Sequence, residues 1–466
     1  MQPPASLWWS TLDEPVSARA SLRAEIDVDV AIVGGGFTGL WSARELLRRD
    51  PSLRVAVLER EVCGCGASGR NGGWASALYP LSDAVLRRHY GDESADDLRR
   101  ALQEAVVDLG RALKEDGIDA HYRRGGTFVG ARNEAQATRL KKSVESAREC
   151  GVTSEDLRWL EVEEAGERVA MSSLLGATFS PHCARVHPAR LVRGLSDVVE
   201  SLGAAIYENT PVTRILPATS RRRATLVTPF SQVSAQYVLR ATEGYTPTLA
   251  GERRTLVPLY SLMIASEPLE ESFFAEIGLG DYETFADDRN LIIYGQRTED
   301  NRLAFGGRGA PYHFGSVVEP RFDVNDRVFS LLESTLHELF PAFDATITHR
   351  WGGALAMPRD LSPFVQVDHE SGLCAAGGYT GDGVVLSRVA AIALADSITA
   401  PDEETAFTRL PFVHHHAKRW EPEPLRWMGI SAGLALAGLA DRAEKRTGRE
   451  SRAGGMLDRL FDQFPP

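Results

Sequence analysis

Short apolar runs alternate with amphipathic stretches along the first sixty residues of the chain. The run from Asp27 to Val33 is rich in Val and Ile, which predicts a buried strand. The stretch from Leu40 to about Arg49 predicts a helix, and Arg54 to Glu59 predicts a second strand. Two buried strands joined by a helix are typical of a parallel sheet.

The same combination of predicted strands and helices occurs twice more, later in the chain. A predicted helix from Ala189 to Leu202 leads into three predicted strands, and the stretch Gly372 to Gly383 leads into an apolar helix, Val384 to Asp396. Between them, residues 251–340 alternate short strands and turns with a helix near Val328 to Leu339, which predicts a mixed sheet over a pocket. The three strands are expected over 204–208, 224–228 and 233–241, and further helices over 96–114 and 134–150.

A glycine motif, Gly34-Gly35-Gly36-Phe37-Thr38-Gly39, connects the first strand to its helix. Gly34 permits a sharp turn off the strand, Gly36 permits close approach of the backbone to a pyrophosphate, and Gly39 permits packing of the helix on the sheet. Glu59 ends the next strand, where a carboxylate accepts the hydroxyls of an adenosine ribose. Strand, motif, helix and acid together predict a dinucleotide site.

Composition and charge narrow the class of protein without naming a function. The 466 residues suggest two to three domains, and a net charge of −12 argues against a nucleic-acid partner. Five cysteines without metal-ligand spacing predict no metal site and a reducing, cytoplasmic location. The amino terminus does not resemble a signal peptide, and no stretch reaches the length of a membrane span.

Two further glycine-rich stretches favour flavin over nicotinamide. They are Gly64 to Trp74, directly after Glu59, and Gly378 to Gly383 before the last apolar helix. An NAD-binding fold does not need them, and the chain has only one GxGxxG with strand and helix context, so it predicts a single bound dinucleotide. The alternative, an NAD-dependent dehydrogenase, predicts a colourless protein.

On these stretches the chain resembles the FAD-dependent oxidoreductases of the D-amino acid oxidase superfamily. The run Gly66-Ala67-Ser68-Gly69-Arg70-Asn71-Gly72-Gly73 is similar to that of the gamma-glutamylputrescine oxidoreductase branch. The resemblance implies an FAD site that includes the glycine-rich loops, the adenine-side Val212 and the strand end at Ala241. The expected cofactor residues are Gly34, Gly36, Phe37, Thr38, Gly39, Glu59, Arg60, Ala67, Ser68, Arg70, Asn71, Gly72, Gly73, Val212, Ala241, Thr242, Gly378, Thr380, Gly381, Asp382, Gly383 and Val384.

Two departures from the family pattern carry expectations. Some relatives attach flavin to a cysteine in the segment that matches Trp351 to Met357, or to a histidine near the first glycine loop; this chain has neither, so non-covalent FAD is expected. Some relatives use a lysine above the flavin to help oxygen react, and the similar strand, Leu303 to Arg308, has none. Oxygen is therefore expected to be a poor acceptor, which leaves both oxygen and an electron carrier open.

The candidate catalytic residues are Arg70, Trp74, Arg308 and Asp382. Arg70 and Arg308 supply positive charge, and Trp74 offers an aromatic wall for an amine, although packing is the simpler role for a single tryptophan. Asp382 precedes the last apolar helix, where a helix cap is favoured over contact with a substrate ammonium group or flavin.

The resemblance implies oxidation of a C–N bond in an amine or amino acid, including a gamma-glutamylated amine, by hydride transfer to FAD. The resulting imine hydrolyses to an aldehyde or keto product. Two alternatives remain open at this point: an N-methyl or D-amino acid dehydrogenase that passes electrons to a carrier, and a flavin-binding protein without turnover. The oligomeric state is not predicted.

The expected fold class is α/β, with two interleaved domains. A Rossmann-like, glutathione-reductase-type FAD-binding domain is expected over 1–82, 150–250 and 345–400. An α+β substrate domain on a mixed antiparallel sheet is expected over 83–149 and 251–344, and a tail that packs on the body over 401–466.

Overall fold

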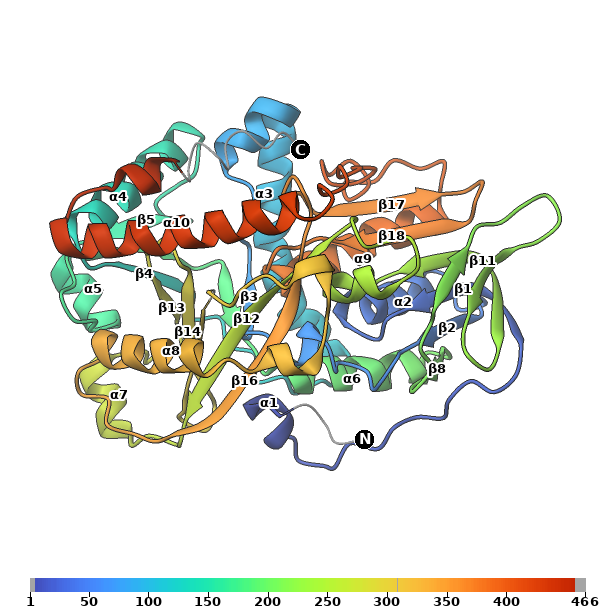
Figure 1. The fold of residues 1–466 in the computed structure, drawn as a ribbon, viewed down its shortest axis with the longest axis horizontal. Coiled ribbons are helices and arrows are strands. Elements are labelled where there is room, and N and C mark those ends of the chain that lie inside the picture. The colour runs from blue at the N-terminus through green and yellow to red at the C-terminus, as the bar shows by residue number, and fades with distance from the viewer. Residues whose placement is uncertain (1–4, 308, 457–466) are drawn as a thin grey trace.

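Two eight-stranded sheets lie side by side in the computed structural model, which describes residues 5–307 and 309–456 (Figure 1). The mixed α/β architecture agrees with the predicted fold class. A third, two-stranded sheet consists of β3 (Trp74–Ser76) and β7 (Cys183–Arg185), and β7 contacts β13 of the second large sheet. No helix in the described part of the chain is both long and apolar enough to cross a membrane.

The first sheet contains five neighbouring parallel strands. Its middle strands are apolar on both faces, so both faces of the sheet are covered by other elements. Helices α2 (Phe37–Arg49), α6 (Pro188–Ser201) and α9 (Gly383–Thr399) share one large apolar core with it. The antiparallel strands β9 (Arg214–Leu216) and β10 (Ala224–Val227) extend from β11 (Gln232–Arg240) and enclose a smaller core with the other face. In sheet order the main strands are the antiparallel edge strand β17 (Phe364–Asp368), then β18 (Leu373–Gly377), β11, β1 (Ile26–Val33), β2 (Val55–Leu58) and β8 (Ala205–Tyr207).

The second sheet is antiparallel except at one junction, where β13 pairs parallel to β4. Helices α8 (Asp326–Leu339) and α7 (Glu271–Ile277) pack with it in a core rich in phenylalanine. In order its strands are β16 (Ile347–Met357), β12 (Val257–Ser266), β15 (Leu303–Gly307), β14 (Ile293–Arg297), β13 (Thr284–Asp287), β4 (Thr127–Ala131), β6 (Gly176–Ser180) and β5 (Arg158–Leu160).

Three strands of the second sheet lie outside the residue ranges expected for the substrate domain. The chain keeps building the second sheet past residue 150, through β5 and β6, and β16 also belongs there although the expected limit is residue 345. These strands are short or follow a helix, so their periodicity alone does not assign them to a sheet. Helix α3 (Asp83–Glu115) also starts earlier than the predicted residue 96, because its first turns precede a kink at Gly91, whose φ is 83°.

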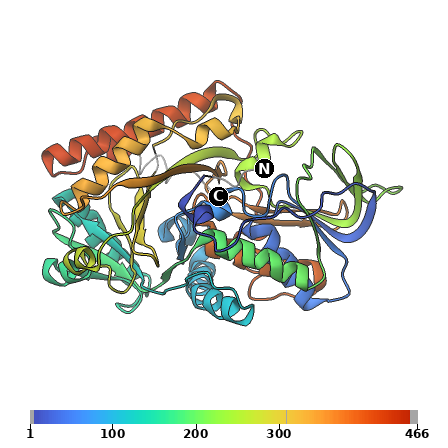
Figure 2. The ribbon, with the colours of Figure 1, turned by 90° about the horizontal axis from the view of Figure 1, so that it is seen from below.

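The remaining helices lie around the second sheet, except for the short α1 (Leu7–Ser10). Its Trp8 ring nitrogen donates to the Asn71 carbonyl at 2.8 Å, so α1 packs against the loop from Gly64 to Trp74. Helix α10 (Leu425–Thr447) crosses the outside of the second sheet and is anchored there by the Asp441 carboxylate, which accepts hydrogen bonds from the backbone amides of Asn290 and Leu291. In the view from below, α10 and α8 both lie toward the same edge of the molecule (Figure 2), and Figure 1 shows them separated along that edge. The other two are α4 (Glu134–Glu149) and α5 (Val162–Arg168).

Candidate functional site

The first glycine motif has the geometry that its spacing predicts. Gly34 has a φ of 110°, and a Cβ there would lie 2.5 Å from the Ala241 carbonyl oxygen. A Cβ on Gly39 would lie 2.1 Å from the Gly34 carbonyl oxygen, so the helix packs too closely for any side chain. The chain therefore turns sharply from β1 into α2, whose 13 residues direct their amino-terminal dipole at this turn.

Glu59 lies beside this turn at the end of β2. One carboxylate oxygen accepts the Gly35 amide at 2.8 Å, and the other accepts the Glu61 amide at 2.9 Å. Burial raises the pKa of Glu59, and these two backbone hydrogen bonds oppose the rise. Because a carboxylate has about four acceptor positions, it retains capacity for two ribose hydroxyls.

The second glycine-rich loop folds back against the first. The Ser68 hydroxyl accepts the Phe37 amide at 2.9 Å, and a Cβ on Gly36 would lie 2.9 Å from that same oxygen. Asn71 closes the loop on itself, because its side chain donates to the Ala67 carbonyl and accepts the Gly73 amide. The loop thus lies across the amino end of α2.

Arg70 is held by groups from three other segments of the chain as well as by its own loop. Its guanidinium is 2.7 Å from the Asp323 carboxylate and donates to the Gly352 carbonyl and the Tyr245 hydroxyl. Burial lowers the pKa of Arg70, but Tyr245 and Asp323 outweigh burial and raise it, so the side chain is a permanent cation. It connects the loop to β16 of the second sheet, and a direct role toward a cofactor remains a prediction.

The third glycine stretch joins the other two through its tyrosine. The Thr38 hydroxyl donates to the Tyr379 hydroxyl at 3.2 Å, which connects α2 to the segment between β18 and α9. Thr380 has a φ of 55°, and Gly378 and Gly381 also have positive φ, so the backbone is tightly coiled here. Asp382 is the N-cap residue of α9, but its side chain makes no capping hydrogen bond, contrary to the role favoured from the sequence.

A glutamate that the sequence reasoning did not select completes this region. Glu243 follows β11, and its carboxyl accepts the Gly378 amide at 2.8 Å. Burial raises the pKa of Glu243 to about 8, against the opposing effects of that hydrogen bond and of Arg240. The detectable signal was its position, directly after the strand end at Ala241 and Thr242, at the carboxyl edge of a parallel sheet.

The second sheet supplies aromatic groups against the loop. Trp74 donates from its ring nitrogen to the Gly295 carbonyl at 3.2 Å, and its ring meets Tyr294 edge-on at 6.2 Å. Tyr294 shares a 2.7 Å hydrogen bond with the Ser261 hydroxyl, and a Cβ on Gly72 would lie 2.6 Å from its ring. Tyr294 was missed because a tyrosine in a short strand carries no motif. Arg308, which the sequence suggested, lies outside the described residues.

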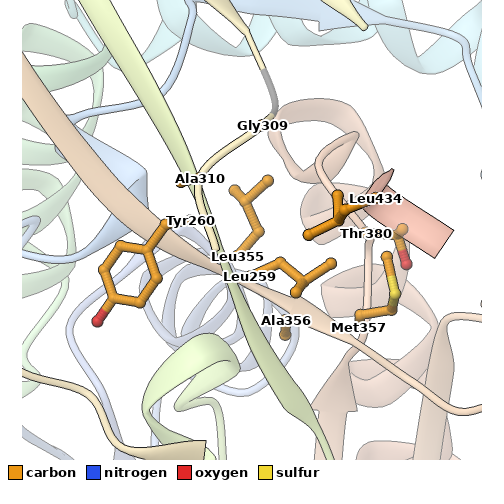
Figure 3. Close-up of a pocket in the computed structure, with 9 residues that line it drawn as sticks. All are labelled: Leu259, Tyr260, Gly309, Ala310, Leu355, Ala356, Met357, Thr380 and Leu434. Carbon is orange, nitrogen blue, oxygen red and sulfur yellow. The ribbon is translucent and has the colours of Figure 1, made fainter. Parts of the chain in front are cut away.

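A small cavity of about 20 Å³ lies next to Thr380, between β12, β16 and α10. This volume holds about one water molecule. Its lining is apolar apart from Thr380 and Tyr260. Figure 3 shows Leu259, Met357 and Leu434 facing one another beside Thr380, with the Tyr260 ring turned away.

The other expected cofactor residues lie around the same three segments. Ala241 borders Gly34, and Thr242 shares a 2.9 Å hydrogen bond with Thr246. Arg60 lies over the Tyr245 ring, and Val212 packs into the apolar cluster beneath β1 and β2. Gly383 and Val384 form the first turn of α9. The three glycine-rich segments thus combine turns that have no room for side chains, the amino ends of two helices, and a carboxylate, Glu59, placed to accept ribose hydroxyls. This set of groups suits FAD.

Comparison with known proteins agrees with this geometry. Residues 29–397 match the profile of a family described as FAD dependent oxidoreductase, DAO. The chain is 30% identical to gamma-glutamylputrescine oxidoreductase of Escherichia coli over 91% of this chain and 95% of that protein. It is 28% identical to glycine oxidase of Geobacillus kaustophilus over 82% and 96%. A crystal structure of glycine oxidase from that organism superposes with a TM-score of 0.71 at 24% identity, covering 84% of this chain and all of that one.

Proposed function

The chain belongs to the DAO family of FAD-dependent oxidoreductases. On that premise we propose that it holds FAD non-covalently and oxidises the C–N bond of an amine or amino acid to an imine that water hydrolyses. A gamma-glutamylated amine is the first substrate to test, because a relative that matches almost the full chain is a gamma-glutamylputrescine oxidoreductase. The observation that carries the proposal is the meeting of three glycine-rich segments, at Gly36 with Ser68 and at Thr38 with Tyr379.

Each segment has a different part in holding the cofactor. The amino end of α2 would face the pyrophosphate of FAD, and Glu59 would accept the ribose hydroxyls. The loop from Ala67 to Gly73 and the stretch from Gly378 to Gly383 would enclose the flavin. When bound, FAD supplies the two-electron oxidant that the protein itself lacks.

The chain's own groups orient the substrate and set the charge around it. The amino end of α9, with 17 residues behind it, favours negative charge at the late glycine stretch by about 0.3 to 2 kcal/mol. Trp74 and Tyr294 form a rigid aromatic wall against which a cationic or neutral amine packs. No carboxylate or histidine is needed as a strong base if the amine binds in its neutral form.

The decisive experiment is anaerobic reduction of the bound flavin across a panel of amines. Gamma-glutamyl amines, polyamines, N-methyl amino acids and D-amino acids are added to the yellow protein, and the visible absorbance is followed. Rapid bleaching by gamma-glutamyl amines with an aldehyde product supports the proposal, whereas bleaching only by N-methyl or D-amino acids favours the dehydrogenase alternative. A spectrum unchanged by the whole panel would favour a flavin-binding protein without turnover.

Non-covalent attachment is tested on the same preparation. Acid precipitation is expected to release the yellow colour into the supernatant, because the segment from Trp351 to Met357 contains no cysteine. Colour retained in the pellet contradicts this part of the proposal. Reoxidation of the reduced protein by oxygen and by an artificial electron acceptor then ranks the two classes of acceptor.

A further inference from the structure

A second cavity, of about 260 Å³, lies between α1, the end of β7, the start of α6 and the turn that follows β14. It shares no lining residue with the cavity beside Thr380, so the two are separate sites. Because a water molecule takes up about 30 Å³ of the liquid, the second cavity has room for a molecule of roughly nine non-hydrogen atoms.

This cavity lies directly against the second glycine-rich loop. Three of its lining residues each donate a hydrogen bond to one of three consecutive loop carbonyls. The bonds run from the Trp8 ring nitrogen to Asn71 at 2.8 Å, from the Gln296 side-chain amide to Gly72 at 2.6 Å, and from the Val186 backbone amide to Gly73 at 2.8 Å. A molecule that displaces this wall therefore also displaces the loop.

Arg185 is a buried cation on this cavity with unused hydrogen-bond donors. The residue is 2% exposed, and within the described chain its guanidinium has one hydrogen-bond partner, Glu299, which it reaches through Nη2. Its Nε–H is buried and makes no hydrogen bond there. Burial lowers the pKa of Arg185, and Glu299 offsets this only in part, so a second anionic partner would stabilise the cation. The planar fork of an arginine matches the two oxygens of a carboxylate.

Gln296 supplies an unused acceptor to the same cavity. The residue is 1% exposed, and its Nε2 faces the carbonyl oxygens of Gly72 and Val186, so its Oε1 points away from them. That oxygen is buried and accepts no hydrogen bond within the described chain. A buried amide oxygen without a donor is unfavourable, and an ammonium group on a ligand would satisfy it.

The charges that line the cavity are balanced, which favours a ligand without net charge. Two arginines, Arg185 and Arg190, are opposed by two acids, Glu299 and Asp300. A dianion such as phosphate would gain from the arginines but would be repelled by both carboxylates. A zwitterion instead meets a charge of opposite sign at each of its ends.

The groups around the lining leave this balance unchanged. Burial lowers the pKa of both His121 and His187, so neither ring carries a charge near pH 7. Outside the lining, Asp13 pairs with Arg190 at 2.5 Å and Arg302 pairs with Asp300 at 2.7 Å, which adds one charge of each sign.

We propose that this cavity binds a small zwitterionic amino acid, with its carboxylate on Arg185 and its ammonium group on Gln296, and that the bound amino acid shifts the loop from Asn71 to Gly73. Leu7 and Trp8 line the same cavity and offer an apolar wall to an aliphatic side chain. L-Leucine matches this wall and the size of the cavity, so it is the probe. Because coupling is reciprocal, a ligand that shifts the loop also alters how the loop holds flavin.

The test is isothermal titration of L-leucine into the full-length yellow protein, where one saturable site is expected. L-Leucinamide lacks the carboxylate and isocaproate lacks the amino group, so each is expected to bind at least about tenfold more weakly. Inorganic phosphate is expected to give no binding heat. Absence of leucine binding overturns the proposal, and so does equal or tighter binding of isocaproate or phosphate, because the site then recognises an anion alone.

Substitution of Arg185 tests the placement of the carboxylate. Arg185→Gln is expected to weaken leucine binding at least about tenfold. Arg123→Gln is the matched control, because it removes an arginine that is 57% exposed and 3.7 Å from the same Glu299, and it is expected to bind leucine as wild type does. Arg185→Lys keeps the charge beside Glu299 and protects the fold, but loses the planar fork, and is expected to bind at least about threefold more weakly. Undiminished binding by a folded Arg185 variant overturns the proposal.

The flavin spectrum tests the coupling to the loop. Under anaerobic conditions L-leucine is expected to shift the visible absorbance of the bound flavin without bleaching it, over the same concentrations that give the binding heat. Bleaching would show that leucine reacts at the flavin as a substrate, and heat without any spectral shift would show that the loop does not respond; either result overturns the proposal. The titration itself requires neither turnover nor flavin, so it remains decisive even where amine oxidation fails.

Discussion

Replacement of Glu243 by glutamine is expected to stabilise the protein in alkaline solution and to leave its stability unchanged in acid. Burial raises the pKa of this carboxyl to about 8 from its ordinary 4.5. The folded state therefore binds a proton between pH 4.5 and pH 8 that the unfolded chain has released, so wild-type stability falls as the pH rises through this window. Glutamine resembles the neutral acid and still accepts the Gly378 amide through its side-chain oxygen.

The magnitude follows from the two pKa values. A tenfold change in proton affinity is worth about 1.4 kcal/mol, so a rise from 4.5 to about 8 corresponds to about 5 kcal/mol at most. Water reaches part of the Glu243 side chain and screens the effect, which leaves about 2 to 3 kcal/mol as the expected difference. For a chain of this length that difference moves the melting temperature by a few degrees.

The assay is thermal unfolding of wild type and Glu243→Gln between pH 4.5 and pH 9, with FAD in excess. The difference between the two melting temperatures at each pH cancels the contribution of all other titrating groups. Asp288→Asn is the control, because burial raises the pKa of Asp288 to about 6, and its difference from wild type is expected to develop fully by that pH. Parallel curves for wild type and Glu243→Gln across the whole range would refute the reasoning.

Three further outcomes are expected. Gly36→Ala is expected to fold with a small loss of stability, because its Cβ would lie 2.9 Å from the Ser68 hydroxyl and displace it from the Phe37 amide, and to bind FAD at least tenfold more weakly in a flavin titration. Gly34→Ala, whose Cβ would lie 2.5 Å from a backbone carbonyl oxygen, is expected to misfold, and equal behaviour of the two variants contradicts this. Arg70→Met is expected to lose about 2 to 4 kcal/mol in urea unfolding because it leaves Asp323 unpaired, and Asp323→Leu added to it is expected to recover part of the loss. Burial lowers the pKa of His187 to about 3, so the folded state binds fewer protons than the unfolded chain below pH 6.5. Wild type is therefore expected to lose stability relative to His187→Gln as the pH falls from 6.5 to 4, and a constant difference in melting temperature argues against a neutral His187.

The first sheet was predictable because its signals are local. The turn at Gly34 and the packing at Gly39 are fixed by a few neighbouring residues, and both occur where the spacing places them. The second sheet was predictable only as a mixed sheet, since β13 pairs with β4 across more than 150 residues and no motif records such a pairing. For the same reason Tyr294 and Glu243 escaped notice: each depends on contacts between segments that are distant in sequence.

The sequence also left the role of Arg70 open, and the reason is physical. A cation in a glycine-rich loop has the same local signature whether its partner is a ligand or a distant carboxylate, and Asp323 lies 253 residues away. Asp382 shows the converse, because a residue at an N-cap position has the local signature of a cap even though its side chain makes no capping bond.

The loop from Gly66 to Gly73 contacts elements of both sheets. It touches the first sheet's helix at Ser68, the second sheet's edge strand through Arg70, and Tyr294 through Gly72. A displacement of any one contact moves a loop that is closed on itself by Asn71, so the others cannot adjust independently. Substitutions in the second sheet far from any glycine motif, at Ser261 for example, are therefore expected to alter the flavin spectrum, and Ser261→Ala, which removes the 2.7 Å bond to Tyr294, provides the direct measurement. A spectrum identical to that of wild type would show that the loop holds its position without the second sheet.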